Sequence, residues 1–194
     1  MRATELFEEG LTLYRELGDE VGVANVLVEL GQVARAQGDY DRAATLSEES
    51  LALGRKLGER TVTAIALNTL GRVERVRGYA EGAIARYEEG LALFREGGDK
   101  WGAAYALANL GVAALQRGEL ERALALIEES FSLYKELGDN AGVALALINL
   151  GDVARERGDE ERATALYNAA YTLHRELGNK RGITRALERL SAKR

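Results

Sequence analysis

Cysteine and proline are both absent from the 194 residues, and histidine and tryptophan occur once each. The lack of cysteine excludes disulfides and thiolate metal sites and fits a reducing compartment. No apolar run approaches the roughly 18 residues needed to span a bilayer, and Met1 leads into no signal-like apolar segment. We therefore expect a soluble, cytoplasmic protein that binds no membrane.

Basic residues are too few for a nucleic-acid-binding surface. Lys and Arg number 26 against 31 Asp and Glu, which gives a formal net charge of −5 at pH 7. Binding to phosphates needs a large excess of positive charge. The charge balance therefore argues against nucleic acid as a direct partner.

The chain does have a repeat of forty residues. Gly31, Gly71, Gly111 and Gly151 fall at steps of forty, and each follows a leucine. Such a period is typical of arrays in which each unit buries its apolar face against its neighbours. An extended binding surface is therefore expected rather than an enclosed catalytic pocket.

Each repeat contains two segments with the apolar spacing of an amphipathic helix. Couplets of glycine and an acid or amide, such as Gly18-Asp19 and Gly38-Asp39, separate them. The glycine can close one helix in the left-handed conformation, and the Asp or Asn can cap the next. The pattern predicts ten helices, at residues 1–17, 20–37, 40–57, 60–77, 80–97, 100–117, 120–137, 140–157, 160–177 and 180–192.

The repeated residues resemble the tetratricopeptide repeat family across essentially the whole chain. The first helix of that family carries a large residue and then Leu-Gly, as at Leu27, Leu30 and Gly31; its second helix carries Ala, an aromatic and a small residue, as at Ala83, Tyr87 and Gly90. The family's closing proline is absent, and its aromatic is Ser47 or Ile127 in two units. The forty-residue period is similar to a subgroup found in kinesin light chains, spindle-orientation adaptors and bacterial arrays attached to regulatory ATPases or transcription activators.

This resemblance implies an all-α fold, a right-handed superhelix of about ten antiparallel helices. One array is expected over residues 1–194, with half-units at 1–19 and 180–194 and full helix pairs at 20–59, 60–99, 100–139 and 140–179. The chain would then open on a second helix and end on a first helix, which favours excision from something longer over capping by the half-units. We also expect weak head-to-tail self-association through residues 1–17 and 180–192, a heterologous contact.

Catalytic residues are not apparent. The single histidine, His174, occupies the repeat position of Tyr14, Gly54, Phe94 and Tyr134, and we interpret it as a variable surface position. Paired acids such as Glu48-Glu49 recur with the repeat, and adjacent helical residues point in different directions, so a solvated outer face is expected. No phosphate-binding loop is present. We predict no enzyme, no metal site and no cofactor.

In the resembled fold the first helices line the concave side, and one row of residues is expected to face that groove. For successive units this row holds Val21, Asn25, Glu29 and Gln32; Thr61, Ile65, Thr69 and Arg72; Trp101, Tyr105, Asn109 and Val112; Ala141, Leu145, Asn149 and Asp152; and Arg181, Arg185 and Arg189. This row changes from unit to unit while the structural leucines repeat, as a recognition surface or an unconstrained surface would. Its candidate peptide-binding residues are Ile65, Arg72, Trp101, Tyr105, Asn109, Leu145, Asn149, Arg185 and Arg189. Trp101 and Tyr105 would be apolar anchors; alternatively, Trp101 packs where Gly97 replaces the leucine of other repeats.

Arginines at four-residue steps, Arg181, Arg185 and Arg189, end the row. Family members that bind chaperone tails grip a terminal carboxylate, and the matching positions here hold Ala108, Val112, Asn149, Arg185 and Arg189. The first two do not suit that role, so the resemblance implies at most an acidic segment near the other three. A solvated basic face is the alternative.

We therefore expect a non-catalytic protein-interaction module that binds a peptide or helical segment, acidic in one reading, in the concave groove. One alternative is a sensor or autoinhibitory segment of a larger signalling ATPase or transcription activator. Another is a structural or engineered repeat scaffold.

Overall fold

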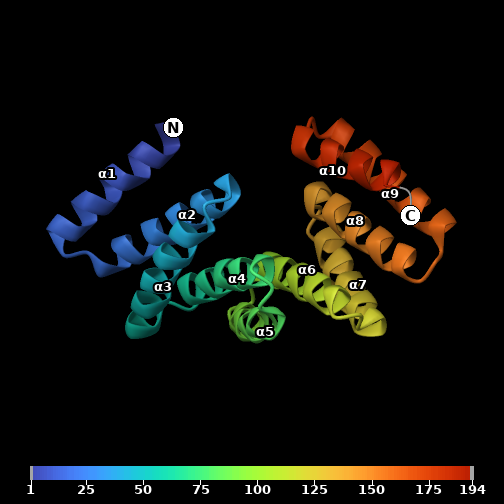
Figure 1. Cartoon of the computed structure of the whole chain (residues 1–194). Helices are drawn as coiled ribbons and strands as arrows, with labels where there is room; N and C mark the ends of the chain where they lie inside the picture. The colour runs from blue at the N-terminus through green and yellow to red at the C-terminus, as the bar shows by residue number, and fades with distance from the viewer. Residues whose placement is uncertain (1, 193–194) are drawn as a thin grey trace. The chain divides into compact units, whose positions relative to one another are not determined.

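The computed structural model describes residues 2–192, and these form an all-α repeat (Figure 1). Every predicted helix boundary within residues 2–192 lies within one residue of the observed one, and the predicted fold class is confirmed. The predicted start of the first helix, at residue 1, lies outside the described residues. The ten helices in the described part of the chain are α1 (Arg2–Leu17), α2 (Glu20–Gln37), α3 (Tyr40–Leu57), α4 (Arg60–Val76), α5 (Ala80–Glu96), α6 (Lys100–Gln116), α7 (Leu120–Glu136), α8 (Asn140–Glu156), α9 (Glu160–Glu176) and α10 (Lys180–Ser191).

Each helix is joined to the next by a glycine turn. Gly38 has φ of +84°, and its N–H bonds back to carbonyls in the last turn of α2. The side chain of Asp39 then accepts a hydrogen bond from the Arg42 N–H at 3.1 Å and caps α3. Glu59 and Tyr79, at the same position in later turns, make no such side-chain bond. In every couplet whose second residue is Asp or Asn, the glycine ends one helix and that residue caps the next.

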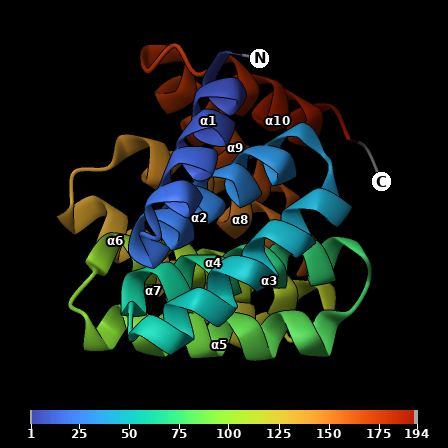
Figure 2. The same cartoon turned by 90° about the vertical axis from the view of Figure 1, so that its left-hand side faces the viewer.

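The helices form two compact units, Met1–Gly102 and Ala103–Arg194, with α6 crossing from one to the other. In the first unit, α2 packs against α3 and also against α4, the first helix of the next pair. Figure 2 shows α1, α2 and α3 of this unit side by side. In the second unit, α8 contacts α7, α9 and α10. Each unit thus brings first helices of successive pairs into contact.

The leucine and glycine of each first helix pack against the second helix of the same pair. Leu27 and Leu67 are fully buried. A Cβ at Gly71 would lie 2.7 Å from Cε1 of Tyr87, and one at Gly31 would lie 2.7 Å from Oγ of Ser47. Any side chain there would collide with the neighbouring helix, which explains the repeated Leu-Gly.

A second close approach joins the end of each second helix to the next first helix. The ring of Tyr134 lies against Gly142, and the ring of His174 lies against Gly182 in the same way. His174 is 4% exposed. The interpretation of position 174 as a variable surface position is therefore wrong: it is a packing position, held by a ring in four of the five second helices.

Surface ion pairs connect successive second helices in the first unit. Arg15 Nη2 lies 2.6 Å from Glu49 Oε1, and Arg55 Nη2 lies 2.5 Å from Glu89 Oε1. These glutamates belong to the recurring acid pairs, all of which are exposed. The acid pairs thus lie on a solvated face, as expected, and some of them take part in ion pairs.

None of the helices within residues 2–192 combines the length and the apolar composition that a membrane crossing requires.

Candidate functional site

In the first unit, a shallow pocket lies between the first helices α2 and α4. It holds about 160 Å³ and is lined by Asn25, Val26, Val28, Glu29, Thr61, Val62 and Ile65. Asn25, Glu29, Thr61 and Ile65 all belong to the row that the sequence places on the groove side. The row is therefore brought together around a hollow of side-chain size. Arg72, two turns further along α4, is half-buried and does not line it.

Trp101 lies in the first turn of α6 with 53% of its surface exposed. The position that a Cβ would take at Gly97 has only the carbonyl oxygens of Leu93 and Phe94 within 4 Å. No atom of Trp101 lies within 4 Å of that position, and about half of the Trp101 surface is open to solvent.

Tyr105 follows one turn later on α6 and is half-buried. Burial, followed by the nearby Tyr105 and Asp139, raises the pKa of Tyr134 on α7. Tyr105 thus lies close to the buried ring of Tyr134 with part of its own surface open. Leu145, on α8, is also half-buried.

Asn109, another turn along α6, is a buried amide that is 9% exposed. Among the described residues, no hydrogen-bond acceptor faces its Nδ2 atom. A buried donor left without a partner costs about 1–3 kcal/mol. Asn109 therefore keeps an unused hydrogen-bond donor on the first-helix face of the second unit.

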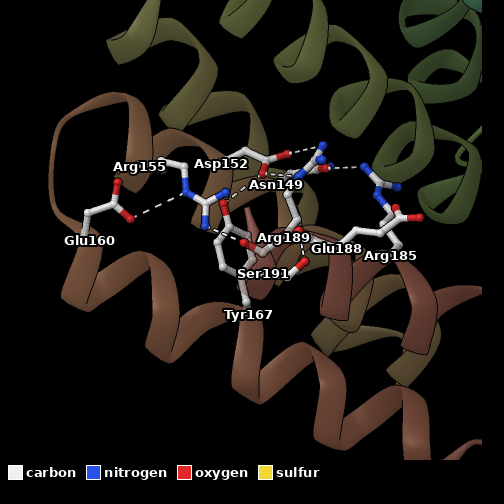
Figure 3. Close-up of polar contacts among 9 residues, drawn as sticks. All are labelled: Asn149, Asp152, Arg155, Glu160, Tyr167, Arg185, Glu188, Arg189 and Ser191. Atoms are coloured by element: carbon white, nitrogen blue, oxygen red, sulfur yellow. Dashed lines mark hydrogen bonds and ion pairs between the residues drawn. The ribbon is translucent and has the colours of Figure 1, made fainter. Parts of the chain in front are cut away.

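Asp152 is the centre of a polar cluster formed by α8, α9 and α10 (Figure 3). The guanidinium of Arg189 donates to both carboxylate oxygens, at 2.7 Å from Nε and 3.2 Å from Nη2. The hydroxyl of Tyr167 donates to Oδ1 at 2.9 Å. Because Asp152 is on α8, Tyr167 on α9 and Arg189 on α10, one carboxylate ties three helices together.

Arg155 completes this cluster from α8. Its Nη2 donates to the backbone carbonyl of Arg189 at 2.6 Å, and its guanidinium carbon lies 4.7 Å from the centre of the Tyr167 ring. Burial, followed by the charge of Asp152, raises the pKa of Tyr167, so the hydroxyl stays protonated and donates. The hydrogen bond from Arg189 to Asp152 is the main cause that raises the pKa of the arginine.

Asn149 and Arg185 form a second contact between α8 and α10. Nη2 of Arg185 donates to Oδ1 of Asn149 at 3.3 Å, and Asn149 is 1% exposed. Burial and then the charge of Arg185 lower the pKa of His174. The structure therefore brings Asn149, Arg185 and Arg189 together as the sequence analysis expects, but with Arg189 held by a carboxylate of its own chain.

Three residues of this cluster were not on the list of candidates. Asp152 belongs to the variable row, and Tyr167 holds the aromatic position of the repeat, whereas no sequence pattern singled out Arg155. A possible signal was the acid and arginine at the same end of successive first helices, Asp152 and Arg189. Within residues 2–192, no group of three or more His, Asp or Glu side chains is placed to hold a metal ion.

Comparison with protein families matches the chain to the tetratricopeptide repeat in four overlapping segments, at residues 2–56, 22–96, 62–136 and 102–176. The structure is similar to that of BtubC (BKLC) from P. vanneervenii, with a TM-score of 0.77 and 20% identity over 97% of this chain and 80% of that one. It is also similar to nearly identical TPR-like repeats of a putative kinesin light chain from Podosopora anserina, with a TM-score of 0.65 and 17% identity over 92% of this chain and 88% of that one. The MamA protein follows with a TM-score of 0.57 and 18% identity over 91% and 94% of the two chains. No curated protein matches in sequence.

Proposed function

Because the chain belongs to the tetratricopeptide repeat family, whose members generally mediate protein–protein interactions as non-catalytic scaffolds, we propose that it binds a peptide or helical segment of a partner protein on its first-helix faces. The observation that carries this proposal is the pocket between α2 and α4, lined by four residues of the variable row. Its volume of about 160 Å³ suits one side chain of a bound segment.

The lining of that pocket favours a peptide over a free metabolite. Val28, Val62 and Ile65 supply apolar contact, while Asn25 and Glu29 supply an amide and a carboxylate on one side. A peptide presents the same mixture of an apolar side chain and backbone N–H and C=O groups. The pocket is open to solvent on one side, so the peptide backbone can run along the helices while one residue enters.

The second unit supports the proposal through a different feature. The half-buried Tyr105 on α6 leaves part of its ring open to a bound segment. Arg185 adds positive charge near Asn149, which suits an acidic residue of the bound segment. Trp101 contributes an exposed aromatic surface to the first unit.

The proposal is tested with peptides selected from a random display library on the immobilised chain. Their affinity is then measured by fluorescence anisotropy for the wild type and for Thr61→Lys, since Thr61 is exposed and lines the pocket. We expect the lysine to weaken first-unit binders at least about tenfold, by obstructing the pocket, with no change in the melting temperature.

Thr45→Lys is the matched control, because Thr45 is also an exposed threonine and lies on the second helix α3 of the same unit, outside the pocket. For peptides bound by the second unit, Tyr105→Ala should reduce affinity without lowering the helix content, because part of the Tyr105 ring is open to solvent. Peptides that bind Thr61→Lys, Tyr105→Ala and the wild type equally would exclude the first-helix faces.

A further inference from the structure

α10 exposes an apolar face that the equivalent first helices bury. Leu187 is 48% exposed, although Leu27, Leu67 and Leu107, at the same repeat position, are each 0% exposed. In the earlier pairs, the equivalent leucine is covered by the second helix of its own pair. Leu27, for example, belongs to a cluster with Leu46 of α3. α10 therefore presents the surface on which a second helix would pack.

α1 exposes the complementary surface, the one that second helices use to cover their first helix. Its leucines Leu6, Leu13 and Leu17 are 62%, 58% and 77% exposed, whereas Leu46, Leu53 and Leu57 of α3 are half-buried.

A small residue marks the same face of each second helix. Ser50 of α3 and Ser130 of α7 donate to the carbonyls of Ala24 and Ala104 on their first helices, at 3.0 Å and 2.8 Å. Gly10 holds this place in α1, and a Cβ there would meet nothing within 4 Å. The packing face of α1 is thus bare.

We infer that α1 of one copy of this chain packs on α10 of another, in the register in which α3 packs on α2. In this register a residue of α1 occupies the place of the α3 residue forty positions later, as Leu17 does for Leu57. A residue of α10 occupies the place of the α2 residue 160 positions earlier, as Leu187 does for Leu27. The inference is independent of peptide binding on the first-helix faces.

This register places two opposite charges, Glu16 of one copy and Lys180 of the other, where an ion pair lies inside the chain. Inside the chain, Lys56 Nζ at the end of α3 lies 2.5 Å from Glu20 Oε1 at the start of α2. The equivalent residues at the junction are Glu16 of α1 and Lys180 of α10. Acid and base have exchanged places, so the two copies remain complementary.

A second charge pair arises between α9 of one copy and α1 of the next. The ion pairs Arg15–Glu49 and Arg55–Glu89 join residues 34 positions apart on successive second helices. The junction places Arg175 opposite Glu9 in the same relation. Across residues 2–192, the side chains of Glu9, Glu16, Arg175 and Lys180 form no ion pair within the chain. All four charges therefore find partners at once in a second copy, which favours that occupant over an unrelated protein.

One contact in the junction is imperfect, and it makes the association weak. Ser191 stands where Gly31, Gly71, Gly111 and Gly151 lie against a side chain of the second helix. In the junction that side chain is Phe7 of the incoming copy, which must shift to clear the serine Cβ. The same geometry predicts that Ser191→Gly tightens the association several-fold.

The test is sedimentation velocity of the 194-residue chain and of two variants, Leu13→Glu and Leu187→Glu, each of which spoils one face. We expect the wild type to grow in mass with concentration, and each variant alone to stay monomeric. An equimolar mixture of the two should form a 1:1 dimer, because each variant retains the face that the other lacks. Such rescue by mixing is specific to a heterologous contact.

Leu137→Glu is the control, because Leu137 is 43% exposed at the end of α7 and lies outside both faces. It should associate like the wild type. Glu16→Lys should weaken the association about threefold or more, and adding Lys180→Glu to the same chain should restore it. A wild type that remains monomeric up to about 1 mM, or variants that fail to pair when mixed, would overturn the inference.

Discussion

The turn between α3 and α4 and the turn between α7 and α8 contain an equivalent volume between a second helix and the next first helix. Side chains from opposite helices fill this volume in the two turns. At the later turn the ring of Tyr134 comes from the second helix and lies on Gly142. At the earlier turn the second helix carries Gly54, and Val62 and Thr63 of the first helix approach it: Oγ1 of Thr63 and Cγ1 of Val62 lie 2.7 Å and 3.2 Å from where a Cβ of Gly54 would be. The fold thus requires a filled volume at this junction and accepts it from either helix.

The largest effect is expected when both sides of the later turn carry a side chain. In Gly142→Val the new Cβ collides with the buried Tyr134 ring, so we expect the free energy of unfolding to fall by about 3 kcal/mol. Urea denaturation measures this change.

A double variant distinguishes complementary packing from general damage. Tyr134→Gly together with Gly142→Val reproduces the arrangement of Gly54 and Val62. The double variant should lose less stability than the sum of the two single losses, by a coupling energy of at least about 1 kcal/mol. Losses that simply add would contradict the comparison.

A smaller effect is expected at His174, where the ring is polar and titratable. Its Nδ1 is buried without a hydrogen-bond partner among the described residues, and burial followed by the charge of Arg185 lowers its pKa. His174→Phe, which copies Phe94, should raise the free energy of unfolding by about 1–2 kcal/mol at pH 7.

The difference in the free energy of unfolding between His174→Phe and the wild type should grow as the solution is acidified. Because the pKa of His174 is lower in the folded state than the ordinary 6.5, the unfolded chain binds the proton first. Stability attributable to His174 is therefore complete above pH 6.5 and declines below it, and the phenylalanine variant lacks this loss. Parallel denaturation curves at pH 7.5 and 5.5 check the difference; an equal decline in both proteins would show that the histidine does not titrate as described.

The smallest effect is expected at the first turn of this type, where Tyr14 lies against Gly22. Tyr14 is 37% exposed and can swing outward, whereas Tyr134 is 1% exposed and cannot. Gly22→Ala should therefore change stability by less than about 0.5 kcal/mol, because helix propensity offsets the small displacement. Gly142→Ala should cost about 2 kcal/mol in the same assay. Similar losses at both positions would mean that burial of the ring does not set the penalty.

The helices were predictable because their boundaries depend on local chemistry. Gly38 and Asp39 end one helix and cap the next through bonds to residues within one turn. The packing role of His174 was not predicted, because the residues at its repeat position, Tyr, Gly, Phe, Tyr and His, differ too much to indicate a buried site when they are considered alone. Only together with the residue eight positions later does the compensation between Gly54 and Val62 become visible.

In the candidate site, too, the features set by local helical spacing were predictable, and the features set by contacts between helices were not. The row formed by Asn25, Glu29, Thr61 and Ile65 follows from helical periodicity, and these residues line one pocket. The bond of Arg189 to Asp152 spans 37 residues and depends on how α10 lies on α8, which helical periodicity does not determine. An arginine such as Arg189, which the sequence suggests for binding an acidic ligand, can therefore already be bonded to a carboxylate of its own chain.

The ion pairs between residues 34 positions apart have a consequence for evolution by duplication. Arg15–Glu49 and Arg55–Glu89 repeat with the forty-residue period, so α3 carries both the acid that pairs with α1 and the base that pairs with α5. The last second helix, α9, departs from this pattern, because Ala169 stands where the acid would be. A copied forty-residue segment inserted between them would meet a matching charge at both of its edges. Such an array can lengthen or shorten by whole helix pairs without a new interface having to be invented.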